Sequence, residues 1–160
     1  MAKATVPDLV TPTWAYAPAP EARDIVTIAP SYGLFIGGRF VEPSSGEGFA
    51  TVNPATGEHL ATVAEAGPVD VRRAVAAARR ALPRWAALAG SDRGKYLFRL
   101  ARIIQERSRE LAVLETLDNG KPIKESRDVD IPLATAHFFY HAGWADKLSY
   151  AFQGLSLIHI

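Results

Sequence analysis

The chain has 160 residues, of which 48% are hydrophobic and 22% are charged, a composition typical of an ordinary soluble globular domain. Its formal net charge of +1 gives no electrostatic reason to expect nucleic acid or an anionic membrane surface as a partner. The chain contains no cysteine, which excludes disulfides, thiolate metal sites and a thiol nucleophile on these residues.

Residues 1–31 form a proline-rich lead segment. Its prolines recur too often for a long helix, and Trp14 and Tyr16 are the side chains that could anchor it. Both an arm lying over a neighbouring surface and a disordered tail fit this composition. The segment does not read as a secretory signal, and no part of the chain approaches the roughly 20 apolar residues of a membrane helix. We therefore expect no membrane association and a cytoplasmic protein.

Two β-hairpins are predicted from about Tyr32 onward. Gly37 and Gly38 suit a tight turn that needs positive φ at both positions. Asn53–Gly57 suits a type I turn with a bulge, since proline occupies the first central position and glycine the end. The strands predicted around these turns are Leu34–Ile36, Arg39–Val41, Phe49–Val52 and His59–Val63.

Four amphipathic helices follow, because the apolar residues then recur at helical spacing. Pro68 fits the first turn of the first helix and Pro83 is predicted to end it, while Ser91 is the predicted N-cap of the second. The predicted apolar stripes are Val71, Ala74, Val75, Ala78 and Leu82 in the first helix; Leu97, Leu100, Ala101 and Ile104 in the second; Leu111 and Leu114 in the third; and Ala134, Phe138, Ala142, Ala145 and Leu148 in the fourth.

The last two helices have clear boundary signals. Ser108 is a candidate cap for the third helix, and Asn119-Gly120 predicts a left-handed C-terminal cap. The fourth helix is predicted from about Asp130 to Leu148, with Pro132 in its first turn. Taken alone, these elements predict a soluble domain with both helices and strands.

Three stretches of this chain resemble the NAD(P)-dependent aldehyde dehydrogenase superfamily. They are Thr51–Glu58 (TVNPATGE), Leu114–Pro122 (LETLDNGKP) and Tyr140–Lys147 (YHAGWADK), in that family's order and near its spacing. The resemblance covers about Tyr32 to Phe152, so residues 32–152 are predicted to be the N-terminal portion of the family's domain. It implies an α/β fold in which these hairpins and helices pack outside a cofactor-binding domain, whose doubly wound sheet lies mostly outside this chain.

The resemblance also implies a reaction for the parent enzyme. A cysteine attacks a small-molecule aldehyde, hydride passes to NAD⁺ or NADP⁺, and a glutamate-activated water hydrolyses the thioester. The parent is expected to be a homo-oligomer. None of the reacting groups maps onto this chain, so no catalytic or cofactor-binding residue is assigned. We expect the fragment to bind neither NAD nor NADP and to be inactive on its own.

One site of the family does map onto this chain. Some members bind a structural monovalent cation through the carbonyl before the Asn-Pro turn and the aspartate at the following helix end, which correspond to Val52 and Asp118. A carboxylate at a helix C-terminus faces exposed carbonyls, and a hard cation turns those oxygens into ligands. Alternatively, Asp118 hydrogen-bonds a nearby backbone N–H or pairs with Lys121.

Other candidate sites have plainer interpretations. His137 and His141 have the i, i+4 spacing of metal ligands, but no third ligand lies nearby in the sequence, which favours ordinary imidazoles. The helix arginines read as a solvated face rather than a nucleic-acid surface. Trp85 and Trp144 read as core or interface aromatics.

Residues 153–160 depart from the family pattern. The chain ends on Leu-Ser-Leu-Ile-His-Ile, which matches the translation of a sequencing adapter, so this tail is predicted to be non-native. The sequence thus predicts an N-terminal fragment of an aldehyde dehydrogenase. The alternative is a natural short, non-catalytic module that binds a full-length homologue.

Overall fold

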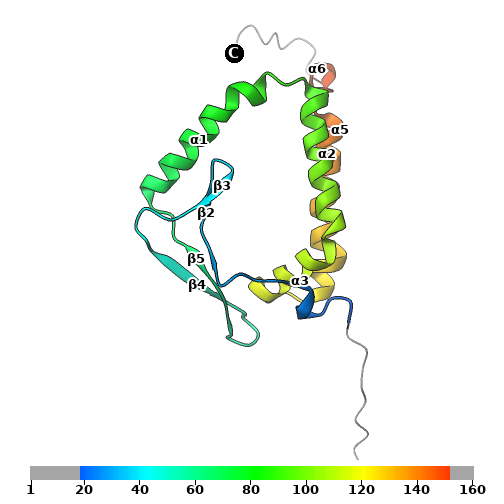
Figure 1. Ribbon diagram of the computed structural model, residues 1–160. Helices are drawn as coiled ribbons and strands as arrows, with labels where there is room; N and C mark the ends of the chain where they lie inside the picture. The colour runs from blue at the N-terminus through cyan, green and yellow to red at the C-terminus, as the bar shows by residue number, and fades with distance from the viewer. Residues whose placement is uncertain (1–18, 152–160) are drawn as a thin grey trace, which may run out of the picture.

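A computed structural model describes residues 19–151, which form an open arch of helices above a small β region (Figure 1). The strands are β1 (Ser31–Tyr32), β2 (Leu34–Ile36), β3 (Arg39–Val41), β4 (Gly48–Val52) and β5 (His59–Ala64). The helices are α1 (Pro68–Ala86), α2 (Gly90–Glu106), α3 (Ser108–Asn119), α4 (Ile123–Glu125), α5 (Ile131–Trp144) and α6 (Leu148–Ala151), with a 3₁₀ turn η1 (Arg23–Ile25) and a π-helical turn η2 (Ser126–Asp130). The predicted anchors Trp14 and Tyr16 and the predicted tail 153–160 lie outside the described residues.

Both predicted hairpins are confirmed. Strands β2 and β3 pair antiparallel across Gly37 and Gly38, whose φ angles of 64° and 84° allow the tight turn. Strands β4 and β5 also pair antiparallel, with an irregularity between Thr51 and Val52. The sequence did not predict β1, which adds in parallel to the other edge of β5.

Residues 19–31 form ion pairs with the rest of the chain. The Glu21 carboxylate lies 3.7 Å from the guanidinium of Arg109 and 3.6 Å from that of Arg127. Arg23 pairs with Glu58 at 2.8 Å, on the turn of the second hairpin. These ion pairs place the segment along the helices and the hairpin, where β1 then joins the sheet.

Helix α1 continues past Pro83, so the prediction that this proline ends the helix is wrong. Proline removes one N–H donor and disfavours the preceding turn, but it leaves its own carbonyl free. That carbonyl accepts the N–H of Ala87 at 3.1 Å, and both Arg79 and Pro83 are exposed, so water can reach the carbonyl that loses its partner. The helix therefore runs to Ala86.

Two other predicted boundaries also shift. Helix α2 begins at Gly90, with Ala89 rather than Ser91 at the cap position. Glycine is required at position 90, since a Cβ there would lie 2.3 Å from the carbonyl oxygen of Ala145 near the end of α5. The predicted fourth helix, from about Asp130 to Leu148, corresponds to α5, which is preceded by η2 and followed by α6. It stops at Trp144, where the Lys147 ammonium donates to the carbonyl of Gly143 at 2.6 Å.

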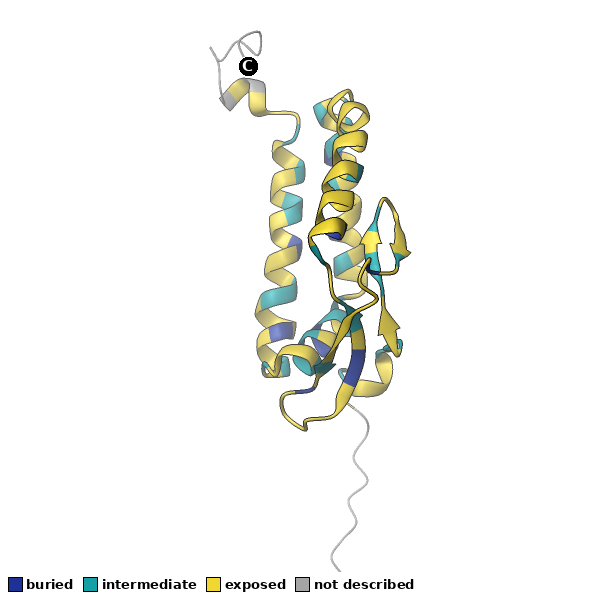
Figure 2. Ribbon diagram, turned by 90° about the vertical axis from the view of Figure 1, so that its left-hand side faces the viewer, coloured by how far each residue is buried: buried dark blue, intermediate teal, exposed yellow. Residues whose placement is uncertain are grey.

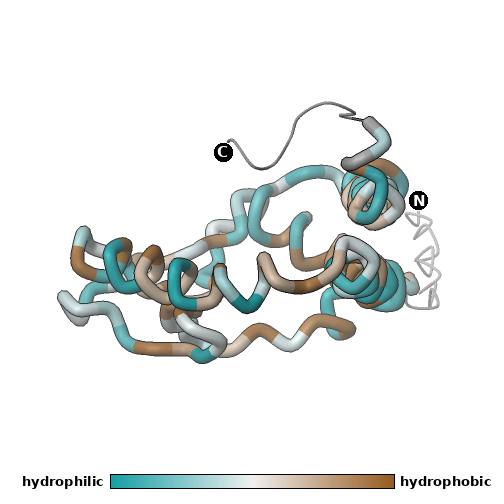
Figure 3. The backbone as a smooth tube through the Cα atoms, turned by 90° about the horizontal axis from the view of Figure 1, so that it is seen from above, coloured by the Kyte–Doolittle hydropathy of each residue, from teal (hydrophilic) through white to brown (hydrophobic). Residues whose placement is uncertain are grey.

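The α2–α5 pair is the main helix contact, and the two helices run side by side (Figures 1 and 3). Glycines permit the close approach, since a Cβ on Gly94 would lie 3.0 Å from the carbonyl oxygen of Ala142. Ala101 of α2 is fully buried, and Phe98 meets Phe139 edge to face at 5.0 Å. Of the predicted α5 stripe, Phe138, Ala142 and Ala145 are half-buried, whereas Ala134 and Leu148 are exposed; Thr135 is the buried residue of this helix.

The predicted apolar stripe of α1 is present, but its larger side chains are exposed in the described chain. Val71, Val75 and Leu82 are 55%, 47% and 58% exposed, because no described element covers this face of the helix. Figure 2 shows how little of the arch is buried, and Figure 3 shows hydrophobic positions along the whole of α1. The buried apolar residues among those described are Leu60, Ala61, Ala101, Ala112 and Val113.

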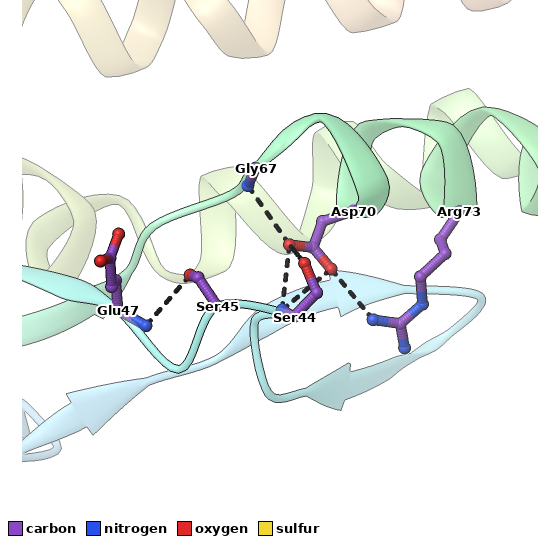
Figure 4. Close-up of polar contacts among 6 residues, drawn as sticks. All are labelled: Ser44, Ser45, Glu47, Gly67, Asp70 and Arg73. Carbon is purple, nitrogen blue, oxygen red and sulfur yellow. Dashed lines mark hydrogen bonds and ion pairs between the residues drawn. The ribbon is translucent and has the colours of Figure 1, made fainter.

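Asp70 fixes the start of α1 (Figure 4). Its carboxylate is 1% exposed and accepts the backbone N–H and hydroxyl of Ser44, the N–H of Gly67 and the guanidinium of Arg73, at 2.8–3.2 Å. An anion with these donors at a helix N-terminus is stabilised in its charged form. The hydrogen bond from the Ser44 N–H is the largest cause that holds the Asp70 pKa below its ordinary value of 3.8.

We expect the Ser44 and Gly67 amides to report this titration. Because the folded pKa of Asp70 is depressed, its stabilising contribution is present above the unfolded pKa and is lost as the pH falls through the folded value. The amide NMR shifts of both residues should change with a midpoint below 3.8. Ser44→Ala, which removes one donor and keeps the backbone N–H, should raise that midpoint. A midpoint at or above the ordinary value would contradict the capping role.

Candidate functional site

The predicted cation residues lie where the second hairpin meets the end of α3. The Oγ1 of Thr51 donates to Oδ1 of Asp118 at 2.5 Å, joining β4 to the last turn of the helix. Val52 follows directly and is exposed, as is Asp118. Asp118 does not pair with Lys121, whose ammonium binds other carboxylates. The structure therefore brings the two sequence motifs together, with the carboxylate held by a hydroxyl.

The Asn-Pro turn is held by hydrogen bonds of its backbone. Asn53 is 7% exposed; its N–H donates to the carbonyl of Glu58 at 2.8 Å, and its carbonyl accepts the N–H of Gly57 at 2.7 Å. The Pro54 ring then lies against Gly120, the left-handed cap of α3 (φ 77°). A Cβ on Gly120 would lie 3.1 Å from the Cβ of Pro54, so the close contact requires glycine.

A second polar group follows the helix end. The Lys121 ammonium lies 2.6 Å from Oδ2 of Asp130, which ends η2, and 3.5 Å from Oε1 of Glu115 in α3. The hydrogen bond to Asp130 is the main reason that the pKa of Lys121 is raised, opposed by partial burial. Glu115 Oε2 is buried and has no hydrogen-bond partner in the described structure. Sequence reasoning missed this group, since the π-helical turn that places Asp130 leaves no simple spacing signal.

Both groups border an apolar cavity of about 640 Å³ beneath the sheet. Its walls come from the sheet, α3 and the start of α5, with Ile28 and Tyr32 at one side. The apolar lining residues include Leu60, Ala61, Val63, Leu111, Leu114, Ile131 and Ala134, and the polar ones are Thr51, Glu115, Asp118 and Asp130. The lining is therefore mostly aliphatic, and three of its polar side chains are acidic.

A second hollow, of about 780 Å³, lies between the β2–β3 tip, α1 and the start of α2. Trp85 and Tyr96 border it with ring centroids 5.5 Å apart. Trp85 and Trp144 are 42% and 40% exposed, so neither is a core residue of the described chain. His137 and His141 are exposed, and residues 19–151 hold no group of three or more His, Cys, Asp or Glu placed to bind a metal.

Comparison with known proteins explains why these motifs come together. The profile of the aldehyde dehydrogenase family matches residues 40–156, well over half of the chain. This chain belongs to the aldehyde dehydrogenase family. It is 48% identical over 118 residues to "Putative aldehyde dehydrogenase DhaS" of Bacillus subtilis, covering 72% of this chain and 24% of that protein. It is 45% identical to mitochondrial aldehyde dehydrogenase family 2 member B4 of Arabidopsis thaliana, over 72% of this chain and 22% of that protein.

Solved structures agree with this assignment. The structure of PnpE in complex with nicotinamide adenine dinucleotide is 46% identical, with a TM-score of 0.71 over 72% of this chain and 24% of PnpE. The NAD⁺ complex of aldehyde dehydrogenase from Bacillus cereus is 42% identical, with the same TM-score over 74% of this chain and 24% of that one. The chain thus has the α/β N-terminal segment of this family and spans about a quarter of the length of these relatives.

We expect Gly120→Ala to loosen the junction between the hairpin and α3. The substituted residue would be held at positive φ, at a cost of about 1–2 kcal/mol, and its Cβ would also press on Pro54. Gly46→Ala is the matched control, because Gly46 has a similar φ of 74° but no atom near its Cβ position. Amide hydrogen exchange should show faster opening of β4 and the end of α3 in Gly120→Ala only. If both substitutions raised exchange to the same extent, and only beside the substituted glycine, the packing role of the contact between Pro54 and Gly120 would be contradicted.

Proposed function

We propose that these residues are the N-terminal part of an aldehyde dehydrogenase that oxidises a small-molecule aldehyde to a carboxylic acid with NAD⁺ or NADP⁺. The observation that supports this most directly is the joining of the Asn-Pro turn to the Leu-Asp-Asn-Gly helix end through Thr51, Asp118, Pro54 and Gly120. Family membership over residues 40–156 supports the same reaction class. A cytoplasmic location and a homo-oligomeric parent belong to this proposal.

The 160-residue chain by itself does not perform this reaction in our proposal. The family's thiohemiacetal chemistry needs a cysteine, and this chain contains none. Gly37 and Gly38 form a hairpin turn rather than a loop that opens a helix, so this glycine pair is not a dinucleotide-binding loop. The role of this segment is therefore structural: it supplies hairpins and helices against which the cofactor domain is built.

A chimera tests this function. Residues 40–151 would replace the matched segment of Bacillus subtilis DhaS, and NADH or NADPH formation would be followed at 340 nm with a panel of aldehydes. We expect the chimera to be active and the 160-residue chain alone to give no reduced cofactor. Activity of the chain alone would overturn the proposed inactivity. A soluble chimera that lacks activity, beside active DhaS, would count against the proposed function.

We also propose a structural monovalent cation held by the Val52 carbonyl and the Asp118 carboxylate. The residues suit a monovalent ion, because one carboxylate and neutral backbone oxygens balance a single positive charge. Asp118 lies in the last turn of α3, where helix carbonyls lack intrahelical donors, and Val52 ends β4. Part of the coordination would come from residues outside this chain, so the chimera is the appropriate form for the test.

The Asp118 side chain provides this test. In the chimera, Asp118→Asn should lower the melting temperature by roughly 2–4 °C in buffers containing Na⁺ or K⁺. The unaltered chimera should melt at a higher temperature in these salts than in the salt of a large organic cation, and the substitution should remove this difference. Asp92→Asn, on an exposed position of α2, is the control and should keep the salt response. If Asp118→Asn left the salt dependence of the melting temperature unchanged, the proposed cation site would be contradicted.

A further inference from the structure

A basic hollow of about 350 Å³ lies between the β2–β3 hairpin and α1. Three arginines line this arginine hollow: Arg39, which begins β3, and Arg73 and Arg80 of α1. Figure 4 shows Arg73 extending from α1 toward the hairpin. The other lining residues are aliphatic or glycine, and none is acidic. The hollow is therefore a small concave surface with three positive charges and apolar walls.

The helix repeat and the hairpin turn bring these arginines together. Arg73 and Arg80 are separated by about two helical turns, so both side chains leave the same face of α1. The tip of the hairpin lies against that face, since a Cβ on Gly37 would lie 3.9 Å from the Cβ of Ala77. Arg39 follows the Gly37-Gly38 turn directly and reaches the hollow from the hairpin side.

Most of this positive charge is not compensated. Within residues 19–151, neither Arg39 nor Arg80 has a carboxylate oxygen within 4.0 Å. Arg73 donates Nη1 to Asp70 at 3.0 Å, yet its side chain is 47% exposed. Because a guanidinium has five N–H donors, Arg73 keeps donors for a second acceptor. An anion in the hollow would relieve the repulsion among the three guanidiniums.

The arginine hollow lies away from the apolar stripe of α1. Residues two positions apart on a helix differ by about 200° in direction, so Val71 and Val75 lie opposite Arg73, and Leu82 lies opposite Arg80. The stripe is the face whose periodicity indicates burial in a larger protein. A segment packed on the stripe would therefore leave the arginines on the other side of the helix in contact with solvent.

We propose that the arginine hollow binds the phosphate group of a small molecule, either free phosphate or a phosphate monoester. The planar fork of a guanidinium donates two parallel hydrogen bonds to a phosphate, which makes arginine the preferred residue for this anion. A phosphate dianion would balance the charges of Arg39 and Arg80, and Arg73 would supply further donors. This site is independent of the dehydrogenase reaction.

A neighbouring hollow offers room for the organic part of a monoester. The 780 Å³ hollow shares Gly37 and Arg80 with the arginine hollow, and Trp85 and Tyr96 border it. An aromatic group attached to the phosphate could pack against these rings. Inorganic phosphate and phenyl phosphate therefore distinguish the two sources of the phosphate group.

Calorimetric titration of the full 160-residue chain with each of these two anions tests the proposal. The titrations would be made at constant ionic strength and slightly alkaline pH, where the phosphate is a dianion. Arg39→Gln and Arg80→Gln each remove one guanidinium of the hollow, on different elements. Arg79→Gln is the matched control, because Arg79 is the exposed neighbour of Arg80 on α1 but lines neither hollow. Circular dichroism would establish that each variant keeps its helices.

We expect saturable binding of phosphate to the unaltered chain. Arg39→Gln and Arg80→Gln should each raise the Kd at least about tenfold, whereas Arg79→Gln should change it less than about twofold. Tighter binding of phenyl phosphate than of inorganic phosphate would support a monoester, and equal or weaker binding would support the free ion. Absence of saturable binding of either anion would overturn the inference. An equal loss in Arg79→Gln would show that net charge attracts the anion, and would also overturn the site.

A longer protein tests whether the hollow stays accessible. Residues 1–151 of this chain would be joined to the part of Bacillus subtilis DhaS that follows its matched segment, and the same titrations repeated. We expect the Kd of the 160-residue chain and the same dependence on Arg39 and Arg80. If the chain bound phosphate but the folded longer protein did not, the hollow would be covered there and the proposed site would be overturned for the enzyme.

Discussion

The contact between the Asn-Pro turn and the left-handed end of α3 joins the strands to the helices. Pro54 lies on Gly120, and Thr51 donates to Asp118, two residues earlier. Because a glycine in the left-handed region ends the helix there, the chain can then turn to place Lys121 beside Asp130. Two motifs that lie more than 60 residues apart in the sequence are thus two sides of one junction.

Local chemistry made much of this fold predictable. The Gly37-Gly38 turn, the Asn53–Gly57 turn and the Gly120 cap each depend on a backbone conformation that few residues adopt, and all three are present. Prolines were less informative: Pro68 begins α1, whereas Pro83 lies inside it. A proline removes one hydrogen bond, and whether the helix then ends depends on solvent access and on the following carbonyls, which composition does not reveal.

Features set by long-range contacts could not be predicted. The parallel pairing of β1 with β5, the π-helical turn before α5 and the Lys121 network all depend on segments that meet only in the folded chain. The candidate site was likewise predictable only in part. The resemblance located Val52 and Asp118, but neither periodicity nor motif indicated that Glu115 would be left with an unpaired oxygen.

The exposed apolar face of α1 has a physical explanation. Helix α1 has the apolar periodicity of a buried helix, yet Val71 and Leu82 face solvent in the described chain. Amphipathic periodicity records the surface that a helix buries in the complete protein, so this pattern requires a larger structure than residues 19–151 provide.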